Sequence, residues 1–276
     1  MLSRLFALTG LGRWRPVCWT LVVTLVANGA AADGGGEQLA QRIYDRADGA
    51  DSAAALVMTL SERGKEPRLR RLVLYRMDKG AGELATMIRF LEPGDISGTG
   101  LLTIDPAAGD SDQWLYLPAM QRVRRVASDR KGGRFVGSDY YFEDLRDRKV
   151  AQDEHRVTGQ ETVGGVRCEV LESVPVDPGN SVYRKRVSCI DPVRLLPMRI
   201  DFFEKSTEAP NKRWTLNRAE QVQGYWTVMD SVMTDLETGH ETRLVVEKIV
   251  YDRGLPEDLF STRALEDEVR ESRHRP

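Results

Sequence analysis

From residue 56 to residue 251, apolar and polar side chains alternate with a period of two through one short segment after another. This period places every second side chain on the same face of an extended strand, so each segment can bury one face and keep the other in water. The alternation predicts a mainly β fold of about 11–12 antiparallel strands. The segments that carry it are residues 56–60, 69–77, 84–90, 101–105, 113–117, 121–127, 156–159, 166–174, 182–190, 196–204, 212–222, 226–235 and 242–251.

A sheet with this many strands buries one face only if it curls or is covered by other elements. Closing it predicts a wide, half-open antiparallel β-barrel whose interior is larger than side chains alone can fill. Residues 37–46 carry Leu39 and Ile43 at helical spacing and predict an amphipathic N-terminal helix. This helix and an acidic turn at residues 139–144 are the expected lids of an apolar cavity.

The expected cavity lining comes from apolar and aromatic residues of the first strands. Such side chains suit an acyl chain, because each CH₂ group that leaves a membrane for water costs ~0.8 kcal/mol, which the cavity must return. The same residues would also suit a dry packed core, and the two residues of the fifth segment would also suit cross-strand aromatic packing. The predicted lining residues are Met58, Val73, Tyr75, Ile88, Phe90, Trp114 and Tyr116.

The N-terminal residues 1–32 have the features of a cleaved secretory signal. Arginines and no acidic residue precede an apolar run at residues 17–27, and three alanines at residues 30–32 provide a cleavage site. A single-pass anchor is the alternative, but the run is shorter than the ~20 apolar residues that span a bilayer. Residues 33–276 contain no linker-like stretch, so we expect one soluble domain in an oxidising compartment, the periplasm.

Two cysteines, Cys168 and Cys189, lie on either side of a turn signal at residues 177–180. In a hairpin that is symmetric about this turn, the two cysteines face each other directly across antiparallel strands. Directly opposed side chains lie close enough for a disulfide. Two free buried thiols are the alternative, and an asymmetric loop would favour it.

The densest group of basic residues lies between residues 122 and 134 of a chain whose formal net charge is −2. These side chains suit contacts with lipid phosphates or an acidic partner surface, and a solvated strand face is the alternative. The negative net charge disfavours nucleic-acid binding. Arg125 is predicted to bind a carboxylate of the acidic turn and so to hold the lid shut. The expected gate or head-group contacts are Arg122, Arg125, Asp139, Glu143 and Asp144.

The stretch from residue 114 to residue 144 also carries a set of motifs in a fixed order. A W-x-Y-x-P strand is followed by R-x-x-R, G-S-D and E-D, and the residues are Trp114, Tyr116, Pro118, Arg122, Arg125, Gly137, Ser138, Asp139, Glu143 and Asp144. This order resembles the LolA-like family of periplasmic outer-membrane lipoprotein-sorting proteins, in particular the longer relatives found with transporters of the resistance-nodulation-division (RND) type. Residues 90–105 and 254–265 resemble the flanking motifs of the same family.

The resemblance implies a LolA/LolB-like half-open barrel with an N-terminal helix and short lid helices. It also implies a phospholipid or acylated lipoprotein as cargo, transient membrane contact, and an inner-membrane RND-type transporter as partner. Three functions fit: a carrier of lipid or lipoprotein between the two membranes, a lipid or lipoprotein sensor that regulates an envelope-stress partner, and a scaffold that binds no ligand. The carrier is favoured, because sensors of this kind usually add a second domain.

Nothing in the sequence indicates an enzyme. The chain has no G-x-S-x-G motif, and its three histidines, His155, His240 and His274, are scattered without a metal-ligand spacing. We therefore expect no catalytic residues, no bound metal and no cofactor.

Overall fold

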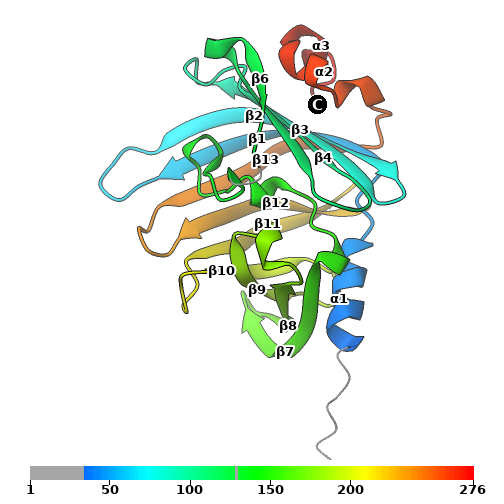
Figure 1. The fold of residues 1–276 in the computed structure, drawn as a ribbon, viewed down its shortest axis with the longest axis vertical. Coiled ribbons are helices and arrows are strands. Elements are labelled where there is room, and N and C mark those ends of the chain that lie inside the picture. Colours follow the sequence, from blue (N-terminus) through cyan, green and yellow to red (C-terminus); the bar gives the residue numbers. More distant parts are fainter. Residues whose placement is uncertain (1–33, 128–129) are drawn as a thin grey trace, which may run out of the picture. The chain divides into compact units, whose positions relative to one another are not determined.

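The computed structural model describes residues 34–127 and 130–276, and the expected signal segment, residues 1–32, lies outside them. In the described part, thirteen strands form one antiparallel sheet (Figure 1). The strands are β1 (Asp51–Ser61), β2 (Arg68–Gly80), β3 (Glu83–Glu92), β4 (Gly100–Asp105), β5 (Asp112–Leu117), β6 (Arg122–Arg125), β7 (Asp153–Val163), β8 (Val166–Pro175), β9 (Tyr183–Ile190), β10 (Pro197–Glu204), β11 (Lys212–Val222), β12 (Tyr225–Asp235) and β13 (Glu241–Tyr251). The predicted fold class is confirmed, and every alternating segment forms its own strand, which makes thirteen rather than 11–12.

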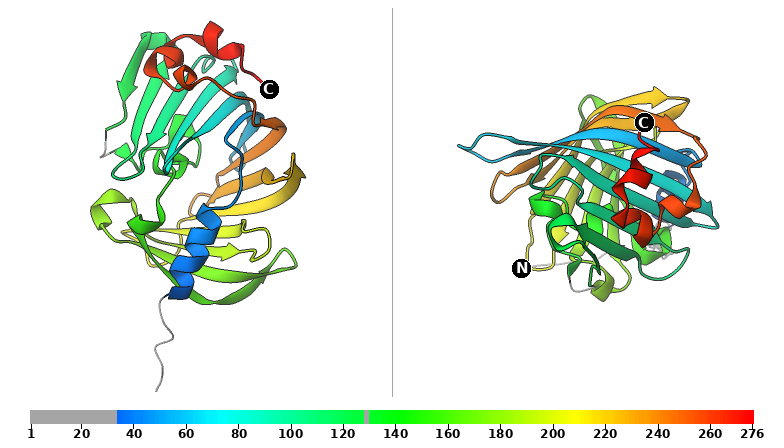
Figure 2. Two further views of the ribbon diagram at one scale, coloured as in Figure 1. Left: turned by 90° about the vertical axis from the view of Figure 1, so that its right-hand side faces the viewer. Right: turned by 90° about the horizontal axis from the view of Figure 1, so that it is seen from above.

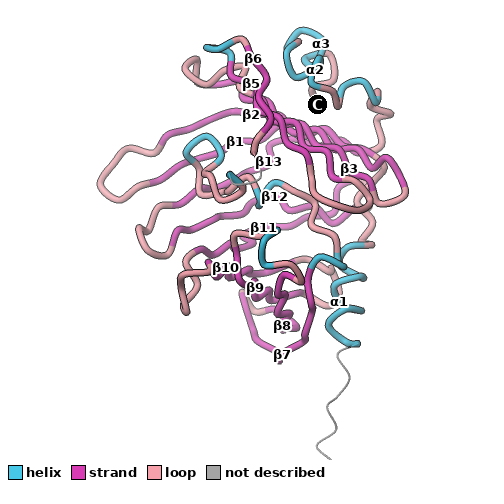
Figure 3. The backbone as a smooth tube through the Cα atoms, viewed as in Figure 1, coloured by secondary structure: helices cyan, strands magenta, loops and turns pink. Residues whose placement is uncertain are grey.

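Except for β6 and β7, strands that follow one another in the sequence pair with each other, and β1 pairs with β13 in the middle of the sheet. The two edges of the sheet are therefore β6 and β7, which are joined by the segment that carries the G-S-D and E-D motifs. The sheet curls so that this segment lies against its inner face (Figures 2 and 3). We call residues 130–147 the plug. It includes the 3-10 helices η3 (Phe135–Gly137) and η4 (Glu143–Leu145).

The plug fills the inner face of the first strands with aromatic side chains. Phe135 and Phe142 of the plug are buried and pack edge to face, with ring centroids 5.8 Å apart. They belong to one core cluster with apolar residues of β1 to β4, which include Leu56, Met58, Leu72, Ile88, Phe90 and Leu101. Arg70 on β2 donates a hydrogen bond to the carbonyl of Val136, 2.6 Å away. The apolar half of the barrel interior is thus occupied by the chain itself.

The outer face of the same strands is covered by the C-terminal segment, which contains η7 (Glu257–Leu259), α2 (Thr262–Glu266) and α3 (Glu268–Ser272) (Figure 2). Leu259 and Leu265 of this segment are buried against Val73, Tyr75 and other outer-face residues of β1 to β4. Both faces of this half of the sheet are therefore buried, which is unusual for antiparallel strands, whose second face commonly meets water.

The N-terminal helix is α1 (Gly34–Tyr44), close to the predicted residues 37–46. Its apolar face buries Leu39 and Ala40 against Leu171 of β8 and Ile190 of β9. Its first turn lies so close to β7 that a Cβ atom on Gly36 would be 2.2 Å from the carbonyl oxygen of His155, and only glycine fits there. None of the helices in the described residues is long and apolar enough to cross a lipid bilayer.

Cys168 and Cys189 form a disulfide, as predicted, with Cα atoms 5.4 Å apart. The predicted register was wrong, because Cys189 lies opposite Val170 rather than opposite Cys168. The loop between β8 and β9 includes the 3-10 helix η6 (Pro178–Asn180), so the hairpin is not symmetric about the turn. A shift of two residues leaves both cysteines on the same face of the sheet, so they still meet diagonally.

Removing this disulfide should lower the free energy of unfolding by about 3 kcal/mol, because the bridge closes a loop of 21 residues in the unfolded chain. The measurement is chemical denaturation of a Cys168→Ser/Cys189→Ser double variant. Reduced wild-type protein is the control, and it should match the variant. A loss below about 1 kcal/mol would show that the bridge does not constrain the unfolded chain in this way.

Candidate functional site

Three adjoining cavities lie between the inner face of the sheet and the elements that cover it. A mouth cavity of ≈ 610 Å³ shares Tyr44, Asp48 and Asp147 with a middle cavity of ≈ 360 Å³. The middle cavity shares Ser188 and Ile200 with an inner cavity of ≈ 270 Å³. These volumes fall close to the range of about 300–1,000 Å³ that is usual for small-molecule sites. Together they form a candidate binding site that runs from the rim into the interior.

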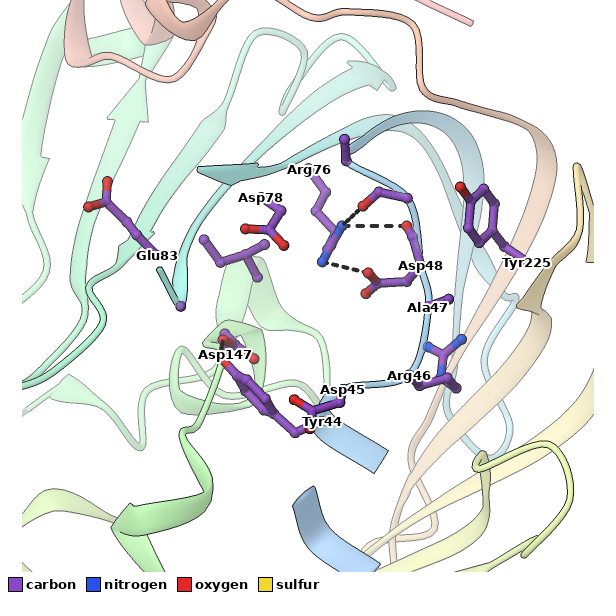
Figure 4. A pocket seen from close by; sticks show the side chains of 14 residues that line it. Tyr44, Asp45, Arg46, Ala47, Asp48, Arg76, Asp78, Glu83, Asp147 and Tyr225 are labelled. Atoms are coloured by element: carbon purple, nitrogen blue, oxygen red, sulfur yellow. Dashed lines mark hydrogen bonds and ion pairs between the residues drawn. The ribbon is translucent and has the colours of Figure 1, made fainter. Parts of the chain in front are cut away.

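The mouth cavity has many polar lining residues, and an ion pair and hydrogen bonds connect them (Figure 4). Arg76 of β2 donates hydrogen bonds to the carboxylate of Asp48, at 2.9 Å, and to the carbonyl of Gly49, at 3.0 Å. Across the opening, Tyr44 at the end of α1 donates to Asp147 of the plug, at 2.9 Å. Burial raises the pKa of Asp48, and the neighbouring Arg76 opposes this shift. The contact between Tyr44 and Asp147 joins the helix to the plug at the entrance.

One wall of the inner cavity is apolar. It is formed by Ile200 and Phe202 on β10, Trp214 on β11 and Met233 on β12. Ile200, Trp214 and Met233 lie directly opposite one another across three neighbouring strands, so they share one face of the sheet, and this face lines the cavity. Tyr140 of the plug is buried against this wall. The arrangement gives a wall of aromatic rings and a methionine, which offer a large area of apolar contact.

The inner cavity is also lined by three arginines, Arg146, Arg148 and Arg186, and Arg186 on β9 lies directly opposite Phe202 on the neighbouring strand. Arg148 and Arg186 both bind Asp153 at the start of β7; Nε of Arg148 lies 2.7 Å from one carboxylate oxygen and Nη2 lies 2.8 Å from the other. The side chain of Arg146 is only 7% exposed. The cavity therefore has both apolar and cationic lining residues.

The acidic turn of the plug is attached to the sheet by buried polar contacts. Asp144 accepts hydrogen bonds from Lys212 of β11, at 2.6 Å, and from the hydroxyl of Tyr183 of β9, at 2.8 Å. The ammonium group of Lys212 also lies 3.6 Å from the ring centre of Tyr141, which is a close cation–π contact. Burial lowers the pKa of Lys212, while Asp144 opposes the shift; burial raises the pKa of the Tyr183 hydroxyl.

Two further carboxylates hold the plug. Asp139 contacts Nδ1 of His240 at 2.6 Å and accepts from the hydroxyl of Thr242 on β13 at 2.7 Å. Glu143 accepts from the hydroxyl of Ser181 and from the backbone N–H of Val182, the latter at 2.7 Å. The G-S-D and E-D motifs thus supply the side chains that bind the plug to strands on the opposite half of the barrel.

The predicted gate between Arg125 and the acidic turn is wrong. Arg125 is exposed and donates to Asp112, which lies on the neighbouring strand β5. It lies opposite Trp114 on the outer face of the sheet, whereas the acidic turn lies against the inner face. Arg122 is also exposed and makes no contact with the turn in the described structure. Lys212 fills the place that was predicted for Arg125.

The seven predicted lining residues do not share one surface. Met58, Ile88 and Phe90 lie on the inner face beneath the plug. The other four lie on the outer face, where the C-terminal segment covers them: Val73, Tyr75, Trp114 and Tyr116. The reason is register, because Ile88 of β3 pairs with Leu74 of β2 and not with Val73 or Tyr75. A role in lipid binding stays a prediction for the inner-face residues alone.

Sequence reasoning missed the lining of the inner cavity. Ile200, Trp214 and Met233 follow the same alternation as the residues of the first strands, so the sequence could predict that they are buried. It could not predict that they share one surface, because this depends on the pairing of three strands. Arg146 carries no sequence signal that separates it from the other arginines of the plug. Its position becomes visible only when the plug is placed inside the barrel.

Comparison with known proteins places the chain among proteins of related sequence and fold. A family model described only as that of an uncharacterized protein matches residues 82–267. A protein domain from Vibrio parahaemolyticus, assigned to outer-membrane lipoprotein sorting, is 30% identical, with a TM-score of 0.80 over 85% of this chain and 100% of that chain. A DUF1329 family protein from Desulfovibrio piger is 29% identical, with a TM-score of 0.80 over 84% and 98%.

A LolA superfamily protein from Nitrosomonas europaea shares the fold at lower identity. It is 17% identical, with a TM-score of 0.64 over 84% of this chain and 98% of that chain. No curated protein matches the sequence. These three solved structures therefore share the fold of this chain.

Proposed function

The chain belongs to the LolA-like family of outer-membrane lipoprotein-sorting proteins, and from this membership we propose that it is a periplasmic carrier that binds an acyl chain of a lipid or lipoprotein. The observation that supports this function is the inner cavity, which is lined by Ile200, Trp214 and Met233 together with three arginines. Such a cavity can contact both the hydrocarbon chain and the polar group of an amphiphile. The proposed route for the acyl chain runs from the polar mouth, past Ser188, to the apolar wall.

The plug supplies a way to capture and release cargo. Phe135 and Phe142 fill the apolar half of the interior in the described structure. If the plug swings out, it exposes Met58, Ile88 and Phe90, and an acyl chain can replace the two phenyl rings on that surface. Each CH₂ group that the chain buries returns ~0.8 kcal/mol, which offsets the contacts that the plug loses. Return of the plug would then expel the cargo.

This competition addresses the main physical difficulty of a lipid carrier. A cavity that fully matched the membrane interior would bind an acyl chain too tightly to release it. Because polar contacts with Lys212, Thr242 and Ser181 hold the plug over the apolar surface, the plug can lower the net affinity for cargo without making that surface less apolar. An RND-type transporter as partner, transient membrane contact and export through the signal at residues 1–32 remain parts of this proposal.

Filling the cavity should abolish cargo binding. Ser188 lines both the middle and the inner cavity, so Ser188→Trp places an indole where the acyl chain would lie. The measurement is mass spectrometry of organic extracts from protein purified from periplasm without detergent. We expect stoichiometric phospholipid or acylated peptide with the wild type and background levels with the variant.

The matched control is Thr215→Trp, which adds the same side chain to the outer face of β11, next to the inward-facing Trp214. This variant should keep its lipid. Lipid retained by Ser188→Trp at the wild-type level would show that the cavity is not the site, and loss from both variants would show a general effect of the added tryptophan. An empty wild-type protein would favour the scaffold, which binds no ligand, over the carrier and the sensor.

A further inference from the structure

We propose that the inner cavity selects amphiphiles with an anionic group, and that Arg146 is the residue that binds this group. The inference rests on the proposed lipid-binding function and narrows it to one ligand class. The ligand would place a carboxylate or phosphate against the arginines and its hydrocarbon chain against Ile200, Trp214 and Met233. A neutral lipid of the same chain length would gain the apolar contacts alone.

Arg146 lacks the partners that a buried arginine normally has. Its side chain is 93% buried, and its Nε atom has no hydrogen-bond partner among the described residues. The nearest carboxylate belongs to Asp110, at 3.7 Å, which is beyond hydrogen-bond distance, and that side chain is 54% exposed. Buried polar groups are nearly always hydrogen-bonded, because an unpaired group loses its interaction with water and gains nothing in return. An anion in the cavity would supply the missing acceptor.

The carboxylates near the cavity do not compete for this arginine. Asp153 is bound by Arg148 and Arg186, Asp144 is bound by Lys212, and Glu143 accepts from Ser181 and Val182. An incoming anion would therefore meet no unpaired carboxylate. Among the three arginines, it would find Arg146 as the one whose carboxylate partner in the described structure, Asp110, lies beyond hydrogen-bond distance.

The size of the cavity supports one polar group rather than a large head group. At ≈ 270 Å³, with a wall shared between arginines and apolar side chains, the inner cavity has room for a carboxylate or phosphate and part of one chain. The adjoining middle cavity, of ≈ 360 Å³, holds space for more of the chain. Arginine suits either anion, because its planar donors match the oxygens of carboxylates and phosphates.

The test compares three ligands with the same hydrocarbon chain: palmitate, hexadecyl phosphate and hexadecanol, each presented from cyclodextrin. Calorimetric titration of the full protein should show that both anions bind at least about tenfold more tightly than the alcohol, which is the usual contribution of a hydrogen bond to a charged group. Arg146→Gln should abolish this preference and leave the affinity for hexadecanol unchanged. Arg146→Lys, which keeps the charge, should restore part of it.

Arg243→Gln is the control, because the Arg243 side chain is 54% exposed on β13 and alternates with Leu244, which packs on the inner face. It should behave as wild type, and thermal denaturation checks that each variant is folded. Inorganic phosphate should compete with palmitate in the wild type if the anion alone is recognised. If all three ligands bind with equal affinity, and Arg146→Gln does not change these affinities, the proposed anion site is wrong, although the protein still binds lipid. Failure of all three ligands to bind the folded wild type would overturn the carrier itself.

Discussion

Replacing Arg89 by methionine should lower the free energy of unfolding by about 3–5 kcal/mol, the usual cost of removing one partner from a buried ion pair. Arg89 is fully buried on the outer face of β3, and its Nε lies 3.7 Å from the carboxylate of Glu271, which is equally buried. It also donates to the carbonyls of Gly98 and Leu265, both at 2.6 Å. Methionine fills a similar space, but it leaves the two carbonyls without this donor and Glu271 without its buried cation. Chemical denaturation measures the loss.

The charge cluster around Arg89 explains why the effect should be large. The hydroxyl of Tyr75 also donates to Glu271, and burial, together with this hydrogen bond, raises the pKa of Tyr75. Arg275 contacts the same carboxylate at 3.2 Å but is partly exposed, so it cannot replace Arg89 fully. The cluster attaches the C-terminal segment to strands that lie far from it in the sequence.

Two control variants distinguish the loss of stability that comes from the unpaired buried charge from a loss that any arginine substitution would cause. Arg68→Met removes an exposed arginine from β2 and should change the stability by no more than about 0.5 kcal/mol. Adding Glu271→Gln to Arg89→Met should recover part of the loss, because the uncompensated carboxylate is then neutral. A loss below about 1 kcal/mol for Arg89→Met alone would show that the C-terminal segment is not attached through this pair.

The strands of this fold could be predicted from the sequence because alternation is a local signal. Segments such as residues 212–222 contain their own evidence of one buried face, and the structure forms β11 there. The face that each strand turns inward is a different question, since it depends on the partner strand. Val73 and Tyr75 alternate as a cavity wall would, but β2 is buried on both faces, and these two side chains meet the C-terminal segment.

The candidate site could be predicted only in part for a related reason. The acidic turn was identified as a lid from its composition, and Asp139, Glu143 and Asp144 do hold it in place. Their partners could not be predicted, because Lys212 lies 68 residues from Asp144 and Thr242 lies 103 residues from Asp139. Nearby charges in the sequence suggested Arg125 instead. The spacing of residues along the chain does not show which side chains meet across the two halves of a curled sheet.

Lys212→Met should lower the free energy needed to open the plug by about 3–5 kcal/mol, because Asp144 would remain buried without its cation. The Asp144 side chain is only 4% exposed, and the Tyr183 hydroxyl would be its main remaining partner from the sheet. Hydrogen–deuterium exchange of residues 130–147 measures the opening free energy directly. The same variant should take up a fluorescent fatty acid faster than the wild type, since the acyl chain and the plug compete for one surface.

The matched control for this variant is Lys185→Met. It removes a lysine of β9 that pairs with Glu172 of β8 at 2.7 Å and touches no part of the plug in the described structure. It should leave exchange within the plug unchanged. If Lys212→Met speeds exchange but not fatty-acid uptake, the plug opens without controlling access, and cargo must enter by the mouth alone. If neither changes, the aromatic contacts of Phe135 and Phe142 hold the plug without the ion pair. Only faster exchange together with faster uptake supports a plug that exchanges places with cargo.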